Sequence, residues 1–263
     1  MMNVPVWAWV LTVALLLTLL AADLVIVDRK PHRMRPAECV RWLTCYVVCA
    51  AVFACLVWLF AGTEPAGQFV AGYLTEYSLS ADNLFVFVLI IARFSVPKIH
   101  EHRVLLFGLL LALLVRSLAI AVGAVAMAEF NPVFYLFGAF LLYTAISTAR
   151  SGNDDEAAEP HRDPLPVRLL RRKLPIVEEY HGARATVKIG GKRYLTPMLL
   201  VIVVIGCTDV LFALDSIPAV FGITKDAYLV FTANAFALMG LRQLYFLLST
   251  LLRTLVYLPY GLA

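Results

Sequence analysis

Long apolar runs separated by short polar stretches repeat along the chain and predict membrane-spanning helices. A helix needs roughly 20 predominantly apolar residues to cross the hydrocarbon core of a bilayer. Seven runs have about this length: 4–27, 40–61, 69–94, 104–127, 132–149, 197–221 and 227–252. The pattern therefore predicts an all-α polytopic membrane protein with about seven transmembrane helices.

Composition agrees with this pattern and excludes an ordinary soluble domain. Of the 263 residues, 62% are hydrophobic and 15% are charged, whereas a soluble domain has about 45–50% apolar and about 25% charged residues. The basic residues lie in short connections between apolar runs, so no separate nucleic-acid-binding domain is expected. The lipid bilayer is the first partner that the sequence predicts.

Basic residues alternate between the connections and predict the orientation of the helices. The first, third and fifth connections contain five, three and ten Lys and Arg residues, while those around Glu64 and Glu129 contain none and the last contains only Lys225. Cytoplasmic loops carry the excess of basic residues. We therefore expect a multi-pass membrane protein with its N-terminus outside. No Lys or Arg precedes the first run, which is interpreted as a retained helix and not as a signal peptide.

The connection 150–196 divides the chain into three parts. Residues 1–149 contain five predicted helices, and residues 197–263 contain the last two helices and the start of a further segment. Within the connection, residues 185–195 alternate around Gly190 and Gly191, which predicts a small β-hairpin. We interpret this part as a cytosolic tether, and a docking surface for protein partners is the alternative.

Acidic residues inside the apolar runs are the strongest functional signal, because ionisable groups at membrane depth are costly and mark functional sites by default. The third run contains Glu76, Asp82 and Asn83, and the sixth contains Asp209 and Asp215. Polar residues that share these runs or lie in other apolar runs are predicted to support them: Asp23, Ser80, Arg116, Thr208 and Ser216.

Helical geometry groups these residues by face. At about 100° per residue, Glu76, Ser80 and Asn83 share one face of their helix. In the sixth run, Thr208 and Asp215 share one face and Asp209 and Ser216 another. Pro218 has no N–H, so a broken or bent helix there would expose carbonyl oxygens beside Asp215.

Residues 82–85 (Asp-Asn-Leu-Phe) resemble residues 209–212 (Asp-Val-Leu-Phe), in runs predicted to enter the membrane from opposite sides. This similarity predicts an inverted repeat of three-helix halves that brings both motifs to the centre of the membrane. Carboxylate, amide and hydroxyl oxygens suit Mn²⁺, Mg²⁺ or Ca²⁺. The five cysteines form no Cys-x-x-Cys pair, which argues against a zinc site.

The alternative is that the acids pair with Arg116 and Arg242 and hold helices together. Four acids exceed two arginines, which favours an ion site. Arg116 is expected to partner a membrane carboxylate, while Asp23 fits either interpretation because Arg29 and Lys30 follow it.

The motifs resemble those of the TerC family, named for tellurium resistance and related to manganese exporters of the LysE superfamily. The similarity covers nearly all of the chain outside the loop 150–196. It is carried by residues 23–24 with 29–32, 76–87, 135–144, 208–219, 231–236 (which contain Asn234) and 240–246.

The resemblance implies an inner-membrane exporter of a divalent metal ion, with Mn²⁺ as the expected ion and no further cofactor. It assigns ion handling to Glu76, Asp82, Asn83, Asp209 and Asp215, with Asn234 among the supporting residues. Two departures reduce the expected activity. Gly206 stands where family members usually have Glu, and members usually continue beyond Ala263 with about two helices, so an extended chain is expected to be more stable or more active.

Two other functions are alternatives to export. A non-transporting membrane scaffold in a metal or tellurite stress-response complex is the main alternative, because an acidic site would repel the tellurite oxyanion. An intramembrane aspartyl protease requires Gly-x-Gly-Asp next to a catalytic Asp, and neither Asp82 nor Asp209 has it. No enzymatic activity is therefore expected.

The predicted orientation can be tested by labelling a cysteine introduced at Asp155, within the loop 150–196. We expect a membrane-impermeant thiol reagent to leave Asp155→Cys unlabelled in intact cells and to label it after the membrane is opened. Labelling from the outside of intact cells would contradict a cytoplasmic loop.

Overall fold

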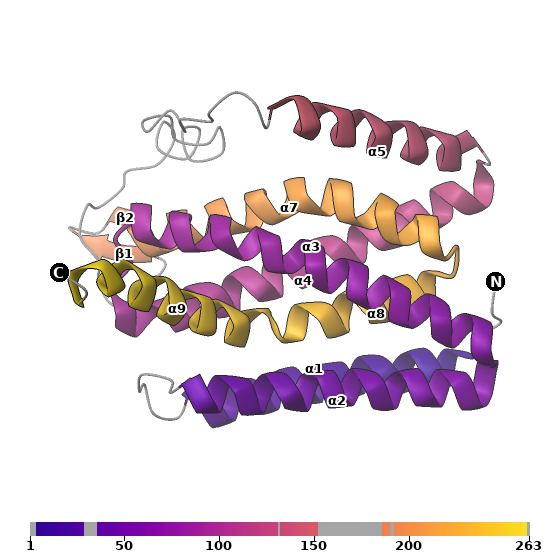
Figure 1. Cartoon of the computed structure of the whole chain (residues 1–263), viewed down its shortest axis with the longest axis horizontal. Coiled ribbons are helices and arrows are strands. Elements are labelled where there is room, and N and C mark those ends of the chain that lie inside the picture. The colour runs from indigo at the N-terminus through magenta and orange to yellow at the C-terminus, as the bar shows by residue number, and fades with distance from the viewer. Residues whose placement is uncertain (1–3, 29–35, 131, 152–185, 190–191, 262–263) are drawn as a thin grey trace. The chain divides into compact units, whose positions relative to one another are not determined.

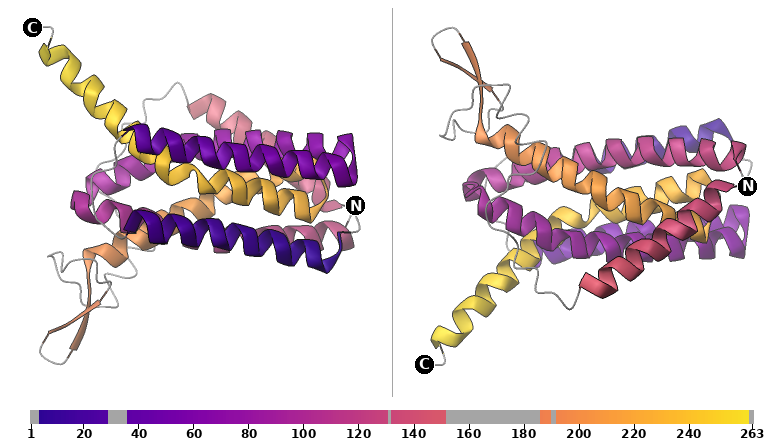
Figure 2. Two further views of the ribbon diagram at one scale, coloured as in Figure 1. Left: turned by 90° about the horizontal axis from the view of Figure 1, so that it is seen from below. Right: turned by 90° about the horizontal axis from the view of Figure 1, so that it is seen from above.

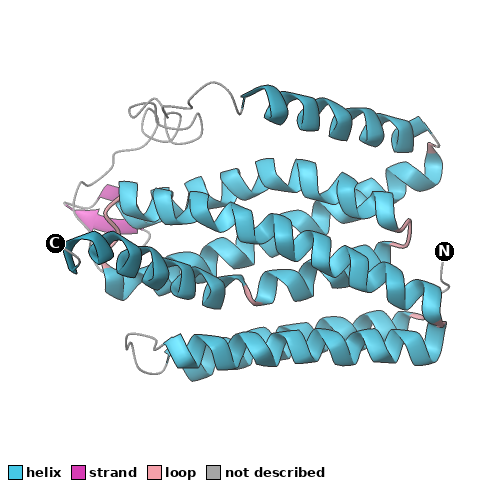
Figure 3. Ribbon diagram, viewed as in Figure 1, coloured by secondary structure: helices cyan, strands magenta, loops and turns pink. Residues whose placement is uncertain are grey.

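The computed structural model describes residues 4–28, 36–130, 132–151, 186–189 and 192–261, which are almost entirely helical (Figures 1 and 3). The predicted all-α membrane fold is confirmed. The helices are α1 (Val6–Asp28), α2 (Pro36–Ala61), α3 (Thr63–Arg93), α4 (Lys98–Glu129), α5 (Pro132–Ser151), α7 (Pro197–Ile223), α8 (Ala227–Met239) and α9 (Leu241–Gly261).

Four helices of the described chain are long and apolar enough to cross a membrane: α2, α3, α7 and residues 103–127 of α4. The described parts of α1 and α5 supply shorter apolar helices, 6–22 and 132–146. These lengths identify an integral membrane protein in contact with lipid. The total of seven spans and the inverted repeat remain predictions.

The predicted helix 227–252 is wrong in one respect, because it is two helices that meet at Gly240. Figure 2 shows α9 leaving at an angle to α8. A Cβ at Gly240 would lie 3.0 Å from Leu43 Cδ1, so the missing side chain lets α2 approach this point. Glycine is also less favourable in a helix interior than most other residues, so a helix breaks more easily at this position. The apolar pattern is continuous across this position and therefore gave no sign of the break.

The chain divides into two compact units, and each is described by itself. The first contains residues 1–88 and 223–263, and the second contains residues 89–222. The boundaries fall within α3 and at the end of α7. Because helices continue through both boundaries, the units are divisions of packing and not sequence domains.

In the first unit, α8 packs against α1 and α2, and α2 also packs against α9. Aromatic side chains fill this core: the ring centroid of Phe53 lies 4.9 Å from that of Phe69 and 5.1 Å from that of Phe236. The hydroxyls of Tyr228 and Thr12 form a buried hydrogen bond of 2.7 Å between α8 and α1. These contacts fix α8 at the centre of the unit, where nearly all of its side chains are buried.

In the second unit, α4 and α7 run parallel and face one another through glycines. The side chain of Ile205 lies over Gly108, that of Leu111 over Gly206, and that of Phe221 over Gly123. These contacts follow the same order along both helices, which establishes the parallel direction. Close approach at small residues is the usual way in which helices associate in membranes.

Two further predictions from the sequence, the β-hairpin and a break at Pro218, concern residues of this unit. Strands β1 (Thr186–Ile189) and β2 (Lys192–Leu195) pair antiparallel, which confirms the predicted hairpin just before α7 (Figure 2). Most of the loop 150–196 and the turn at 190–191 lie outside the described residues. Helix α7 continues through Pro218, so the helix is not broken there, although the proline still removes the amide donor that the carbonyl of Leu214 would use.

We expect Gly206→Val to lower the thermal stability of the purified protein, because any Cβ at this position collides with Leu111. Overpacking of this kind costs about 1–3 kcal/mol. The matched control is Gly138→Val on α5, where a Cβ would meet no atom within 4 Å. Adding Leu111→Ala to Gly206→Val should recover the loss. Equal melting temperatures for Gly206→Val and Gly138→Val would contradict the contact.

Candidate functional site

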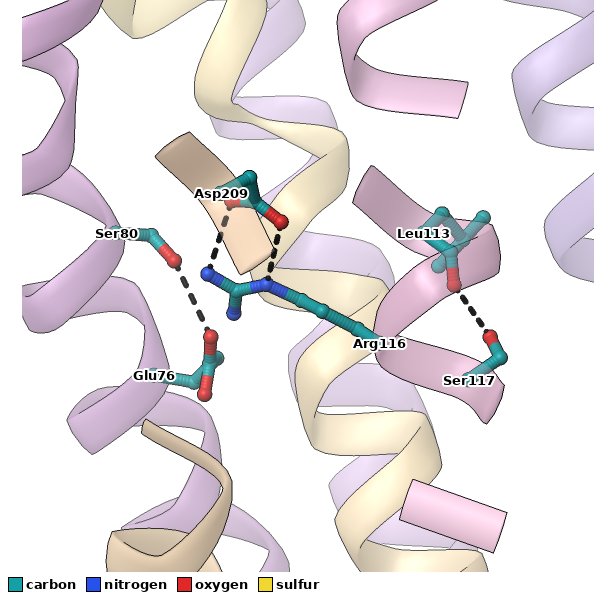
Figure 4. A network of polar contacts seen from close by, with 6 residues as sticks. All are labelled: Glu76, Ser80, Leu113, Arg116, Ser117 and Asp209. Carbon is teal, nitrogen blue, oxygen red and sulfur yellow. Dashed lines mark hydrogen bonds and ion pairs between the residues drawn. The ribbon is translucent and has the colours of Figure 1, made fainter. Parts of the chain in front are cut away.

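A buried ion pair joins α4 to α7. Arg116 donates from Nε to Asp209 Oδ2 at 3.1 Å and from Nη2 to Asp209 Oδ1 at 3.2 Å, and the two side chains are 1% and 3% exposed (Figure 4). This two-point geometry is the strongest arrangement of a guanidinium and a carboxylate. The carboxylate partner that the sequence predicts for Arg116 is therefore Asp209.

The electrostatic consequence is that α7 carries a carboxylate with a permanent counter-charge. Arginine stays protonated in proteins, so the positive charge beside Asp209 does not disappear. Both oxygens of Asp209 accept hydrogen bonds from this one side chain. An incoming cation that binds Asp209 must therefore compete with the guanidinium for the same oxygens.

Helix α3 provides a second buried acid. Glu76 is fully buried, and the Ser80 hydroxyl, one helical turn later, donates to Glu76 Oε1 at 3.3 Å (Figure 4). This contact confirms that Glu76 and Ser80 share a face. Asn83, which was predicted to share it too, is half-buried.

The other two acids are exposed on the surface of the chain. Asp82 follows Glu76 by six residues, and Asp215 follows Asp209 by six, and in each case only the first acid is buried. Six residues turn a helix by about 240°, which places the two acids of each pair on different faces. Asp82 and Asp209, which the similar segments 82–85 and 209–212 align, therefore differ in burial.

The supporting residues have mixed environments. Ser216 is buried, and its Oγ has no hydrogen-bond partner among the described residues. The half-buried Thr208 donates its hydroxyl hydrogen to the Val204 carbonyl at 2.8 Å, and its oxygen can still accept. Asn234 is buried in α8. The side chain of Asp23 lies outside the described residues.

Gln243 is among the buried polar residues that the sequence analysis did not single out. Its side chain is fully buried, and it follows the buried Arg242 at the start of α9. The available signal was a polar pair two and three residues after Gly240, inside an apolar run. Over its described residues, neither unit groups three or more His, Cys, Asp and Glu side chains for metal binding.

Comparison with known proteins decides the family. The model of the "Integral membrane protein TerC family" matches residues 61–263, which include α3, α4, α7 and the acids described above. The chain belongs to the TerC family.

Membrane proteins of several bacteria are similar to this chain. An uncharacterized membrane protein of Mycobacterium tuberculosis (strain CDC 1551 / Oshkosh) is 46% identical over 97% of this chain and 64% of its own length. An uncharacterized membrane protein of Myxococcus xanthus is 38% identical over 97% of this chain and 79% of its own length. The chain therefore spans less than two thirds of the mycobacterial relative.

One relative carries a functional name. The protein of Escherichia coli (strain K12) named "Putative membrane-bound redox modulator Alx" is 36% identical over 93% of this chain and 78% of its own length. No solved structure matches the chain.

The departure at Gly206 has a structural counterpart in this TerC chain. The side chain of Leu111 occupies the space that a residue at position 206 would need. A glutamate there, as the family pattern expects, would require Leu111 to move. Restoring the acid alone would therefore disturb the contact between α4 and α7, and Leu111→Ala should accompany Gly206→Glu.

Proposed function

We propose that this chain exports a divalent metal ion, with Mn²⁺ as the expected ion, across the inner membrane. The observation that carries the proposal is Glu76, a fully buried carboxylate in the middle of α3, a helix of 31 residues that is long and apolar enough to span a bilayer. Acids at this depth are rare and mark ion and proton pathways. Asp209 occupies a comparable place in α7.

The proposed ion-handling residues are Glu76, Asp82 and Asn83 in α3 and Asp209 and Asp215 in α7. Their carboxylate and amide oxygens are hard donors, which suit Mn²⁺ better than soft metals. Asp82 and Asp215 are exposed on the surface of the chain, so no packing contact has to break before an ion reaches them. The same carboxylates can carry protons, which makes exchange of the metal for protons a reasonable coupling.

The proposed orientation follows from the basic residues in the loops between the helices. The N-terminus is placed outside and the loop 150–196 in the cytoplasm, where it offers a surface for protein partners. No enzymatic step, cofactor or nucleic acid is required by export. The transported ion is the substrate.

A non-transporting membrane scaffold is the second candidate. The Arg116–Asp209 pair favours it, because a fully neutralised acid is also what a structural contact between helices needs. The redox role in the name of the E. coli relative belongs to that protein. In this chain all five cysteines are free thiols, and none is part of the proposed ion path.

Asp82→Asn and Asp215→Asn separate the two candidates. We expect each to abolish metal export while the protein remains in the membrane at its normal level, because neither exposed side chain supports the packing of the chain. Asparagine keeps the volume and removes the charge that a divalent cation requires. The measurements are the membrane protein level by immunoblot and the cellular Mn²⁺ content after Mn²⁺ stress in a deletion strain.

The matched control is Glu129→Gln, which neutralises an exposed acid at the end of α4. It should export as the unaltered chain does. Normal protein levels with unchanged Mn²⁺ content in both aspartate variants would eliminate the exporter role of these residues and leave the scaffold.

A further inference from the structure

Apolar contacts between α4 and α7 flank the ion pair on both sides along the helices. On α4, Gly108 and Leu111 precede Arg116 and Gly123 follows it, and each of these three contacts a side chain or a glycine of α7. The ion pair thus lies within an interface that is already closed on both sides by apolar contacts.

A buried ion pair is also a poor source of stability. Removing two charges from water is costly, and replacing such a pair by apolar residues is often neutral or stabilising. The cost is greater in the interior of a membrane. The presence of Arg116 and Asp209 in a well-packed apolar interface therefore points to a role other than holding the helices.

The geometry of the pair defines this role. Arg116 engages both carboxylate oxygens of Asp209, at 3.1 and 3.2 Å. These are the oxygens that a hard divalent cation would bind. The guanidinium and a metal ion therefore exclude one another at Asp209.

Ser216 provides a second polar group on the same side of α7. It lies seven residues after Asp209, which is about two helical turns, and before Phe221, which contacts Gly123. Its Oγ is buried and has no hydrogen-bond partner among the described residues. A buried polar group without a partner among the described residues therefore lies on the helix face that carries Asp209.

We propose that Arg116 is a resident cation at Asp209, which the transported metal ion must displace. This inference rests on the proposed export function and concerns the regulation of its affinity. Without metal, the guanidinium neutralises the charge of Asp209. With metal, its competition weakens binding, so that the ion is released again. Arg116 is a positioning residue that sets the affinity, not a ligand.

The test measures Mn²⁺ binding to the purified full chain by equilibrium dialysis. Lysine at position 116 keeps the charge and loses the two-point geometry, so Arg116→Lys should bind Mn²⁺ more tightly than the unaltered chain. The expected change is about tenfold in the dissociation constant, as for the loss of one hydrogen bond to a charged group. Ser117→Ala is the matched control, because the Ser117 hydroxyl bonds only within α4, to the Leu113 carbonyl (Figure 4), and it should bind as the unaltered chain does.

Tighter binding is the diagnostic result, because a pair that only holds helices would lose stability on substitution without gaining affinity for Mn²⁺. Unchanged or weaker binding by Arg116→Lys, in a chain that otherwise binds Mn²⁺, would overturn the inference and leave the export function intact. Absence of Mn²⁺ binding in the unaltered chain would instead overturn the proposed function, and the inference with it.

If Arg116→Lys does not accumulate in the membrane, the inference is tested with the neutral double variant Arg116→Gln/Asp209→Asn. It removes the charges together and leaves no uncompensated ion. Normal protein levels with weaker Mn²⁺ binding would support the inference, because the loss would show that the carboxylate held by Arg116 is also a ligand of the ion. Mn²⁺ binding equal to that of the unaltered chain would show that the pair has only a structural role.

Discussion

The central interaction of α4 and α7 is the neutralisation of a buried charge, because an uncompensated charge in an apolar interior is costly. Asp209 is held by Arg116 through both of its oxygens, and glycines on either side of the pair let side chains of the opposite helix close the interface. Glu76, equally buried, accepts a hydrogen bond from its own helix through Ser80. Asp209 thus has a permanent counter-charge, and Glu76 has the Ser80 hydroxyl among its partners.

The helices could be predicted from the sequence because lipid imposes one simple requirement, a run of apolar residues of sufficient length. For the same reason, a change in the path of a helix cannot be predicted from hydrophobicity when the residues on both sides of it are apolar. The break at Gly240 is such a change, since it depends on the approach of Leu43 to a position without a side chain. The β-hairpin was predictable because few structures other than a hairpin combine strict alternation of residue types with two glycines at its centre.

The acids of the candidate site could be found from the sequence, but not their environments. All four lie in apolar runs, yet only Glu76 and Asp209 are buried, and Asp82 and Asp215 are exposed. The choice of Asp209 as the partner of Arg116 depends on how α4 and α7 face one another, which no local pattern encodes. Gly206 was noticed only as a missing acid, whereas the structure shows that Leu111 fills its place.

The central claim is that the chain itself moves a divalent cation through a membrane. The most direct measurement is Mn²⁺ entry into proteoliposomes that contain only the purified chain and an enclosed dye quenched by Mn²⁺. We expect quenching that depends on the protein and that far exceeds the leak of protein-free vesicles. Folded, correctly inserted protein that gives no more quenching than protein-free vesicles would contradict the claim.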